Sequence, residues 1–496
     1  MNATESGTDA SELSRSEVRG RALTGVLYVT ASGGINLLIG FVGNLALARM
    51  LTPEDFGVVA VGLTATLLGT AISDGGLGAG MIRRREPPKR SELRTLNGIQ
   101  LAIAAAVVAP ICLIALGFGR TGAITAIMIL SLPITMLQTP GRVVLARNML
   151  YDRQAAVDAA GQMSFYLFAV TTVALGADVW GLATATLVRA TTSTVLIALL
   201  SVGFLAPSLR GWRGFGPLVS FGLRFQATPL LYVLREQGVN LVTAVAGGLG
   251  VLGLWTLASR LIQVPILAFT SLYTVGFPAM SRILAGGEDP GPIILRVVRR
   301  ASIVAALVFP AFIAASPALI PALFGTQWSD AANVLPFVGV STVILGSISV
   351  GALSYLNAAG RPGIVAVATA TFGVIWVALT ACLLPSLGIE AIGVGNLCGA
   401  LVEAVILDRA TRRAAGVAPY RPLLRPLAVA LFAGTTAWIA CVAGPAGLAM
   451  ALGAGALGFF LSAAGLVVVC RSDLRDTLQL ATGMLPPMSL PRRKNT

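Results

Sequence analysis

The sequence has no histidine and few charged residues. Only 11% of its 496 residues are Asp, Glu, Lys or Arg, while 56% are hydrophobic. A soluble domain has about 25% charged residues. The mean hydropathy of +0.84 means that the chain could not cover its surface with polar groups in water. The composition therefore excludes a soluble, disordered or collagen-like chain and indicates an integral membrane protein.

The missing residues and motifs also exclude several chemistries. Without histidine the chain lacks the commonest general base and metal ligand. Neither of its two lysines stands in a GxxxxGK(S/T) motif, and no GxSxG motif occurs. No two cysteines form a CxxC pair, so we expect the five cysteines to be packing residues that form no disulfide bonds. The sequence predicts no enzyme, no catalytic residue, no metal and no cofactor. The cysteines are Cys112, Cys382, Cys398, Cys441 and Cys470.

Long apolar runs are abundant, and the connections between them are short. Each run has about 20 residues, the length that a helix needs to cross a bilayer. We count fourteen runs, which predict an all-α polytopic membrane protein with about 14 transmembrane helices. The predicted spans are 24–48, 57–79, 95–118, 122–141, 156–177, 179–203, 217–246, 250–276, 301–324, 333–357, 363–385, 388–408, 426–443 and 446–470.

Basic residues are distributed unequally between the two sets of connections. With fourteen spans, 29 Lys and Arg residues fall on the side of the termini, and only Arg49 and Arg120 fall on the other side. Cytoplasmic connections are enriched in Lys and Arg. Both termini are therefore predicted to be cytoplasmic. Membrane topology accounts for the net charge of +14, and no nucleic-acid partner is expected.

A weak internal repeat relates the two halves of the chain. Phe56-Gly57 opens the second span, and Leu252-Gly253 opens the eighth, 196 residues later. The fourth and tenth spans each run into a Gly-Arg pair, which ends at Arg142 and Arg361. Internal repeats are common in transporters. The predicted domains are a disordered cytoplasmic tail at 1–21, an N-terminal lobe at 22–203, a C-terminal lobe at 204–408, two further helices at 409–470 and a cytoplasmic tail at 471–496.

Four arginines fall inside the predicted spans, namely Arg189, Arg224, Arg235 and Arg260. A charge at the centre of a bilayer costs about 2.5–3.5 kcal/mol on insertion scales, so such residues usually face a cavity or a partner. Arg224 and Arg235 are eleven residues apart, which places them on one helix face about 16 Å apart. We interpret the four arginines as a cationic lumen that binds an anionic substrate, because guanidinium donors match phosphate oxygens. The alternative is structural pairing, of Arg235 or Arg260 with Glu236 or of Arg189 with another helix.

Three acidic residues are candidates for ion or proton coupling. Glu236 follows Arg235 directly, Asp74 precedes a glycine-rich stretch, and Glu403 lies within the twelfth predicted span. Acidic side chains at this depth often belong to proton or ion pathways. The alternative for Asp74 and Glu403 is a charge at a helix end or at the membrane interface.

Five segments, in order along about two thirds of the chain, resemble segments of bacterial polysaccharide (Wzx-type) flippases. Each segment is loosely specified, but the set is fairly specific. The segments are ALARMLTPEDFG at 46–57, ISDGGLG at 72–78 with MIRR at 81–84, GFPAMSR at 276–282, LFGTQW at 323–328 and NAAGRP at 357–362.

The resemblance implies the multidrug/oligosaccharidyl-lipid/polysaccharide exporter superfamily. It implies two six-helix lobes around a central cavity, two additional C-terminal helices and transport by alternating access. The implied substrate is a polyprenyl-pyrophosphate-linked glycan in the bacterial cytoplasmic membrane. The implied partners are membrane lipids, a polysaccharide polymerase and glycosyltransferases.

Two other functions are kept as alternatives. A multidrug exporter of the same superfamily would need an acidic lumen for cationic drugs, which the four intramembrane arginines disfavour. A membrane polysaccharide polymerase or glycosyltransferase usually carries a large external loop with catalytic side chains, and the short connections leave no room for one.

Cysteine labelling tests the predicted topology. A cysteine placed beside Arg84, in the connection 80–94, is expected to be shielded from an impermeant reagent added outside the cell, because this connection is predicted to be cytoplasmic. Reporter fusions to both termini are expected to give the cytoplasmic signal. Labelling of that cysteine from outside would contradict the topology.

Overall fold

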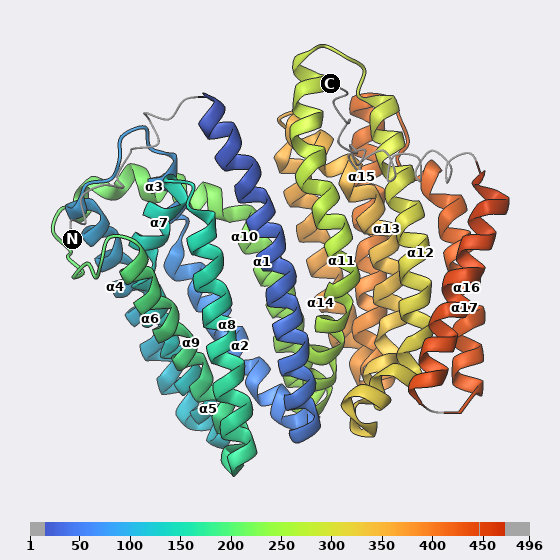
Figure 1. The fold of residues 1–496 in the computed structure, drawn as a ribbon, viewed down its shortest axis with the longest axis horizontal. Helices are drawn as coiled ribbons and strands as arrows, with labels where there is room; N and C mark the ends of the chain where they lie inside the picture. Colours follow the sequence, from blue (N-terminus) through green and yellow to red (C-terminus); the bar gives the residue numbers. More distant parts are fainter. Residues whose placement is uncertain (1–14, 446, 472–496) are drawn as a thin grey trace, which may run out of the picture. The chain divides into compact units, whose positions relative to one another are not determined.

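Every regular element in the described part of the chain is a helix. The computed structural model describes residues 15–445 and 447–471 (Figure 1). Eleven helical stretches are long and apolar enough to cross a membrane, so the predicted all-helical membrane class is confirmed. The elements are α1 (Arg15–Met50), α2 (Pro53–Asp74), α3 (Leu77–Arg83), α4 (Arg90–Ala115), η1 (Leu116–Phe118), α5 (Gly119–Ile129), α6 (Ser131–Met136), α7 (Thr139–Arg147), α8 (Tyr151–Thr172), η2 (Val173–Ala177), α9 (Asp178–Leu200), η3 (Trp212–Phe215), α10 (Gly216–Ala246), α11 (Gly248–Ala285), α12 (Gly291–Phe324), η4 (Thr326–Trp328), α13 (Ala331–Ala358), α14 (Pro362–Leu387), α15 (Glu390–Ala415), α16 (Arg421–Ala443) and α17 (Leu448–Val469).

The helix bounds differ from the predicted spans in a few places. α2 ends at Asp74, five residues before the predicted end, because Gly75 and Gly76 adopt left-handed backbone conformations with φ of 50° and 69°. The fourth predicted span, 122–141, is divided among α5, α6 and the start of α7. Residues 15–21, predicted as part of the tail, form the beginning of α1. The remaining predicted tail residues, except Arg471, lie outside the described residues.

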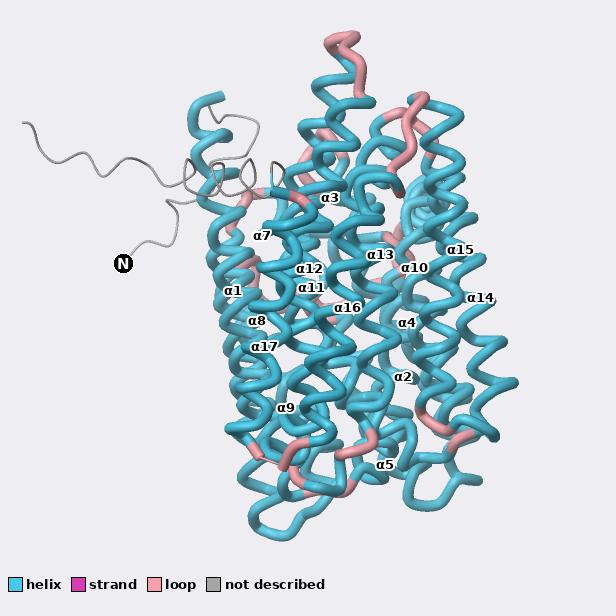
Figure 2. The backbone as a smooth tube through the Cα atoms, turned by 90° about the vertical axis from the view of Figure 1, so that its right-hand side faces the viewer, coloured by secondary structure: helices cyan, strands magenta, loops and turns pink. Residues whose placement is uncertain are grey.

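The chain forms two compact units. The first comprises the described residues up to Leu257 together with Thr380–Ile389, and the second comprises Ala258–Leu379 with the described residues from Glu390 onward. Two helices, α11 and α14, therefore contribute to both units. Figure 2 shows the loops at the ends of the long helices, as expected where bilayer-embedded backbone must form its hydrogen bonds within helices.

In the first unit, α2 is the central helix. It packs against α4, α5, α9 and α10, while α8 packs between α1 and α9. One end of α2 is fixed by a capping box in which Thr52 and Asp55 exchange hydrogen bonds. Arg120 of α5 pairs with Asp55 at 3.2 Å and also with Asp178 of α9. A single guanidinium therefore joins three helices at this end.

In the second unit, α12 is the central helix. It packs against α13, α16 and α17, and α13 packs against α15. Gly458 of α17 allows a close backbone approach, because an added Cβ there would lie 2.9 Å from the Pro310 carbonyl oxygen of α12. The buried ring of Trp376 on α14 donates its Nε1–H to the Ile392 carbonyl of α15 at 2.9 Å.

The glycines of the internal repeat lie against each other's helices. An added Cβ at Gly57 of α2 would lie 1.9 Å from the Leu249 carbonyl oxygen of α11, and one at Gly253 would lie 1.7 Å from the Pro53 carbonyl oxygen. Each glycine thus faces the residue four positions before the other glycine. The contact is therefore reciprocal: the starts of α2 and α11, which the internal repeat relates, pack against each other with local two-fold symmetry. Only glycine permits so close a contact.

Alanine at either glycine tests this contact. Gly57→Ala and Gly253→Ala are each expected to lower the free energy of unfolding by about 1–3 kcal/mol, because the methyl group would overlap a backbone carbonyl. Gly250→Ala on α11, the helix of Gly253, is the matched control, since nothing lies within 4 Å of an added Cβ there. The control should retain or raise the melting temperature in detergent, because alanine favours helix. Equal melting temperatures for all three variants would contradict the close contact.

Candidate functional site

α10 is the long helix whose polar residues the sequence singled out. Pro217 occupies its first turn, and its early turns pack against the junction of α2 and α3. Gly222 and Gly76 permit that packing, because an added Cβ at Gly76 would lie 2.4 Å from the Gly222 carbonyl oxygen. The start of α10 therefore packs against the glycine break after α2. This packing fixes the position of Arg224 and of the residues that follow it on α10.

Arg235 and Glu236 form an ion pair on α10. The Arg235 guanidinium donates to Glu236 Oε1 through Nη2 at 2.7 Å and through Nε at 3.2 Å. It also lies over the Tyr232 ring, 5.0 Å from the ring centroid. The Arg235 side chain is only 16% exposed, whereas that of Glu236 is 43% exposed. The pairing considered as the structural alternative is thus present, with the arginine as the more enclosed partner.

Arg224 has a different environment on the same helix. It is exposed, and its guanidinium donates to the Ser220 hydroxyl, one turn earlier, at 2.8 Å. Arg224 and Arg235 are separated by about three helical turns, as the sequence predicted. One guanidinium is thus bound to a neutral hydroxyl and the other to a carboxylate.

A polar network joins α10 to α2 beside this ion pair. The Thr64 hydroxyl donates to Gln237 Oε1 at 2.8 Å, and Asn240 Nδ2 donates to the same oxygen at 3.1 Å. Trp255 Nε1 of α11 donates to Asn240 Oδ1 at 3.1 Å. Thr64 and Gln237 are buried. The network fixes the rotation of α10 about its axis and thereby the direction of Arg235 and Glu236.

Only half of this network can be recognised from the sequence. Gln237 and Asn240 stand out as polar residues in an apolar span, but Thr64 resembles any threonine of a membrane helix, whose hydroxyl usually bonds its own backbone. Trp255 resembles any apolar core residue. Their contribution depends on the packing of α2, α10 and α11, which no local pattern specifies.

The other predicted arginines lie elsewhere. Arg189 of α9 is exposed, packs near Gly161 and interacts electrostatically with Asp158, Tyr166 and Arg142. Arg260 of α11 is half-buried and belongs to the second unit. Only Arg224 and Arg235 are therefore on a common element, and a role for all four in one lumen stays a prediction.

The two remaining acidic candidates have defined surroundings. Asp74 accepts hydrogen bonds from Gln100 Nε2 at 3.2 Å and from the Gly76 backbone N–H at 3.2 Å. These contacts join the end of α2 to α4 and stabilise the glycine break. Glu403 of α15 is buried in the second unit and accepts a hydrogen bond from the Thr369 hydroxyl at 3.1 Å. A coupling role for either carboxylate stays a prediction.

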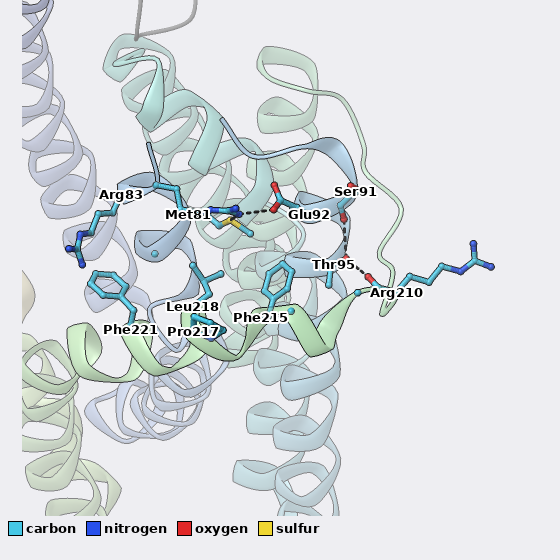
Figure 3. Close-up of a pocket in the computed structure, with 14 residues that line it drawn as sticks. Met81, Arg83, Ser91, Glu92, Thr95, Arg210, Phe215, Pro217, Leu218 and Phe221 are labelled. Carbon is cyan, nitrogen blue, oxygen red and sulfur yellow. Dashed lines mark hydrogen bonds and ion pairs between the residues drawn. The ribbon is translucent and has the colours of Figure 1, made fainter. Parts of the chain in front are cut away.

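A second group of charged residues, which the sequence did not single out as a site, surrounds a cavity at one end of the first unit (Figure 3). Arg83 ends α3, Arg84 follows it and Glu92 lies in the first turn of α4, while Arg210 comes from the segment before η3. Their clustering depends on folding, because more than a hundred residues separate Arg210 from the others.

The fold and the charged face of α10 define a multi-pass membrane protein with ionisable groups within its helical bundle, as is typical of transporters. The family described as "Polysaccharide biosynthesis protein" matches residues 46–333. The match covers more than half of the sequence, and the chain belongs to this family.

Two relatives agree with the family. The lipopolysaccharide biosynthesis protein WzxC of Escherichia coli (strain K12) is 23% identical over 338 residues, which cover 65% of this chain and 67% of that protein. The succinoglycan biosynthesis transport protein ExoT of Rhizobium meliloti (strain 1021) is 25% identical over 393 residues, which cover 77% of this chain and 75% of that protein. The resemblance expected from the five segments is confirmed.

Solved structures share the fold. The lipid II flippase MurJ in an inward closed conformation has a TM-score of 0.71 and 11% identity, covering 90% of this chain and 99% of that one. An inward-facing multidrug resistance MATE family transporter of the MOP superfamily has a TM-score of 0.61 and 16% identity, covering 75% and 94%. At these identities the likeness concerns the fold alone.

Replacing Thr64 tests the polar network. Thr64→Val is expected to lower the free energy of unfolding by about 1–3 kcal/mol, because Gln237 loses a hydrogen-bond donor in a buried position. Thr66→Val is the control, since the Thr66 hydroxyl donates to the Gly62 carbonyl of its own helix at 2.8 Å. Thermal unfolding in detergent measures both variants. A control that is as unstable as Thr64→Val would refute an interhelical role for Thr64.

Proposed function

We propose that the protein is a flippase that moves a lipid-linked oligosaccharide or polysaccharide precursor across the cytoplasmic membrane. The observation that carries this proposal is the family match at residues 46–333. The names of WzxC and ExoT, which refer to lipopolysaccharide biosynthesis and to succinoglycan biosynthesis transport, point to the same substrate class. The MurJ-like fold supports a transport mechanism and gives no reason to propose a catalytic step.

The proposed topology has fourteen spans with both termini in the cytoplasm. Two of the eleven candidate spans, Arg90–Met136 and Tyr151–Leu200, are 47 and 50 residues long. The first contains α4 followed by α5 and α6, and the second contains α8 followed by α9, so each is long enough to cross a bilayer twice at about 1.5 Å per residue. α10 is not among the eleven, but its 31 residues are long enough to cross at about 1.5 Å per residue.

The ends of the helices in the first unit support this orientation. Arg147 donates to the carbonyl oxygens of Met81, Ile82 and Arg84, and Arg94 donates to that of Ala206. Three of the basic connections that were assigned to the cytoplasm therefore lie together. Arg120, assigned to the opposite side, pairs with the separate cluster of Asp55 and Asp178.

The proposed organisation is two six-helix lobes, 22–203 and 204–408, around a central cavity, with two further helices at 409–470. The reciprocal glycine contact at Gly57 and Gly253 supports a repeat, because it pairs equivalent positions of the two halves. Alternating access between the lobes would then carry the head group outward. The glycan lipid, membrane lipids, a polymerase and glycosyltransferases are the proposed partners.

The proposed substrate-binding residues are Arg224, Arg235, Arg260 and Arg189. Their charge suits a pyrophosphate, since each guanidinium can donate two parallel hydrogen bonds to phosphate oxygens. A multidrug exporter with the same fold is the second candidate, favoured by the MATE likeness, but a basic helix face would repel cationic drugs. The proposed coupling residues are Glu236, Asp74 and Glu403.

Energy would come from gradients rather than from nucleotide hydrolysis. With the inside negative, outward movement of an anion is assisted by about 2.3 kcal/mol per charge for each 100 mV. The potential alone could thus contribute several kcal/mol for a pyrophosphate. A coupled cation would add to this contribution.

Reconstituted transport tests the proposal. Proteoliposomes with the purified protein are expected to flip a polyprenyl-pyrophosphate oligosaccharide without ATP and to respond to an imposed potential. Arg224→Ala and Arg235→Ala should each lower the initial rate about tenfold, the loss expected for one charged hydrogen-bonding partner. Arg235→Lys should retain part of the rate, because lysine keeps the charge but not the paired donors.

Arg413→Ala serves as the control for these variants. Arg413 is exposed in the last turn of α15 and is outside the proposed lumen, so its removal should leave the rate unchanged. Strict ATP dependence, or equal transport of small cationic drugs, would refute the flippase. Normal rates for both α10 alanine variants would refute the role of α10 and leave the flippase intact.

A further inference from the structure

The cavity at the basic end of the first unit has a volume of about 770 Å³, within the usual range for small-molecule sites. It lies between the end of α3, the start of α4 and the start of α10, so it is at the ends of the membrane helices. Its lining carries three arginines and one glutamate. The charged lining residues are Arg83, Arg84, Arg210 and Glu92.

Hydrogen bonds fix the backbone of the segments that form the walls of the cavity. Arg147 donates to the carbonyl oxygens of Met81 and Ile82 at 3.1 Å and to that of Arg84 at 2.6 Å. On the opposite wall, the Thr95 hydroxyl donates to the Arg210 carbonyl at 2.6 Å. The cavity is therefore a built feature of the fold, with its arginines attached to fixed backbone.

The floor of the cavity is apolar. Met81 and Phe215 are buried there, and Leu218 and Phe221 continue the surface along α10 (Figure 3). The Arg83 guanidinium lies over the Phe221 ring, 4.7 Å from its centroid. Figure 3 shows Arg83 and Arg210 at opposite ends of the cavity, and Arg84 pairs with Glu92 at 2.7 Å. Cationic groups thus border an apolar surface, an arrangement that suits an anionic amphiphile.

The segment beside the cavity has the composition of a membrane interface. Phe204, Leu209 and Trp212 are 65%, 56% and 59% exposed, although they are large and apolar. Arg210 and Arg213 alternate with them. Exposed aromatic rings next to arginine are typical of segments at the level of lipid head groups, where rings meet lipid and guanidinium groups meet phosphate. The composition of this segment therefore suits a position at the level of phospholipid head groups.

We propose that this cavity binds an anionic phospholipid from the surrounding leaflet. Arg83 and Arg84 bind its phosphate, and its glycerol backbone and the start of an acyl chain lie on Pro217, Leu218 and Phe221. The apolar floor and the interfacial segment favour a lipid over free phosphate, which needs no apolar surface. Lipid bound there would hold α10 against α3 and α4, because all three elements line the same cavity.

Binding of fluorescent phosphatidylglycerol to the purified full-length protein in neutral detergent tests this site. We expect saturable binding that is at least about tenfold tighter than binding of phosphatidylcholine with the same chains. Arg83→Gln with Arg84→Gln should weaken phosphatidylglycerol binding about tenfold or more, because two charged donors are lost. Ser91→Trp, at an exposed position of the lining, keeps every charge but should also reduce binding, because the ring enters the cavity.

The control variant removes two positive charges, as the Arg83 and Arg84 double variant does, from the same predicted connection 80–94. Arg85→Gln with Arg90→Gln changes two exposed arginines that do not line the cavity, and binding should be retained. Equal loss in both double variants would reveal general charge attraction and overturn the site. Equal binding of the two lipids would overturn it as well. Displacement by equimolar inorganic phosphate would assign the site to soluble anions, and stronger displacement by the lipid-linked glycan would assign it to the transport substrate.

Discussion

The absence of water from the bilayer core is the constraint on which this structure depends. Backbone groups must form their hydrogen bonds within helices, and a polar side chain inside the bundle needs a partner from the protein. Helices also gain little from burying apolar surface against one another in lipid, so their association relies on close packing and on a few polar contacts. Both are visible where α2 meets its neighbours. Gly57 and Gly253 allow backbone contact, and Thr64 and Gln237 supply a buried hydrogen bond.

The same constraint favours charged residues at the helix ends, where their side chains join one helix to another. Arg147 binds several carbonyl oxygens at the end of α3, which a helix leaves without intrahelical partners. At the other end of the unit, Arg120 joins α5 to α2 and α9 through Asp55 and Asp178. Long guanidinium side chains can reach between helices and bind more than one acceptor. The predominance of arginine over lysine in this sequence fits such roles.

The helices were predictable from sequence because apolar run length is a direct consequence of bilayer thickness. The predicted span 57–79 continued through Gly75 and Gly76, whose left-handed backbone conformations end α2 at Asp74. The polar face of α10 was predictable as well, since charged residues stand out in an apolar span. The partners were predictable only in part: the sequence left Arg235 and Arg260 as alternative partners of Glu236, and Thr64 is identified as a partner only by helix packing.

The proposed anionic substrate would have to replace a different partner at each of the two arginines of α10. Arg224 is exposed and bound to the neutral hydroxyl of Ser220, so a phosphate arriving there replaces a weak partner. At Arg235 the phosphate must replace a carboxylate, because Glu236 already occupies the guanidinium. In the proposed coupling role of Glu236, a cation bound to its carboxylate would weaken that pair and favour the exchange. Linkage is reciprocal, so substrate at Arg235 would in turn favour binding of the cation to Glu236. An ion pair that is structural at rest thus supplies a physical route by which an ion gradient could be coupled to movement of the substrate.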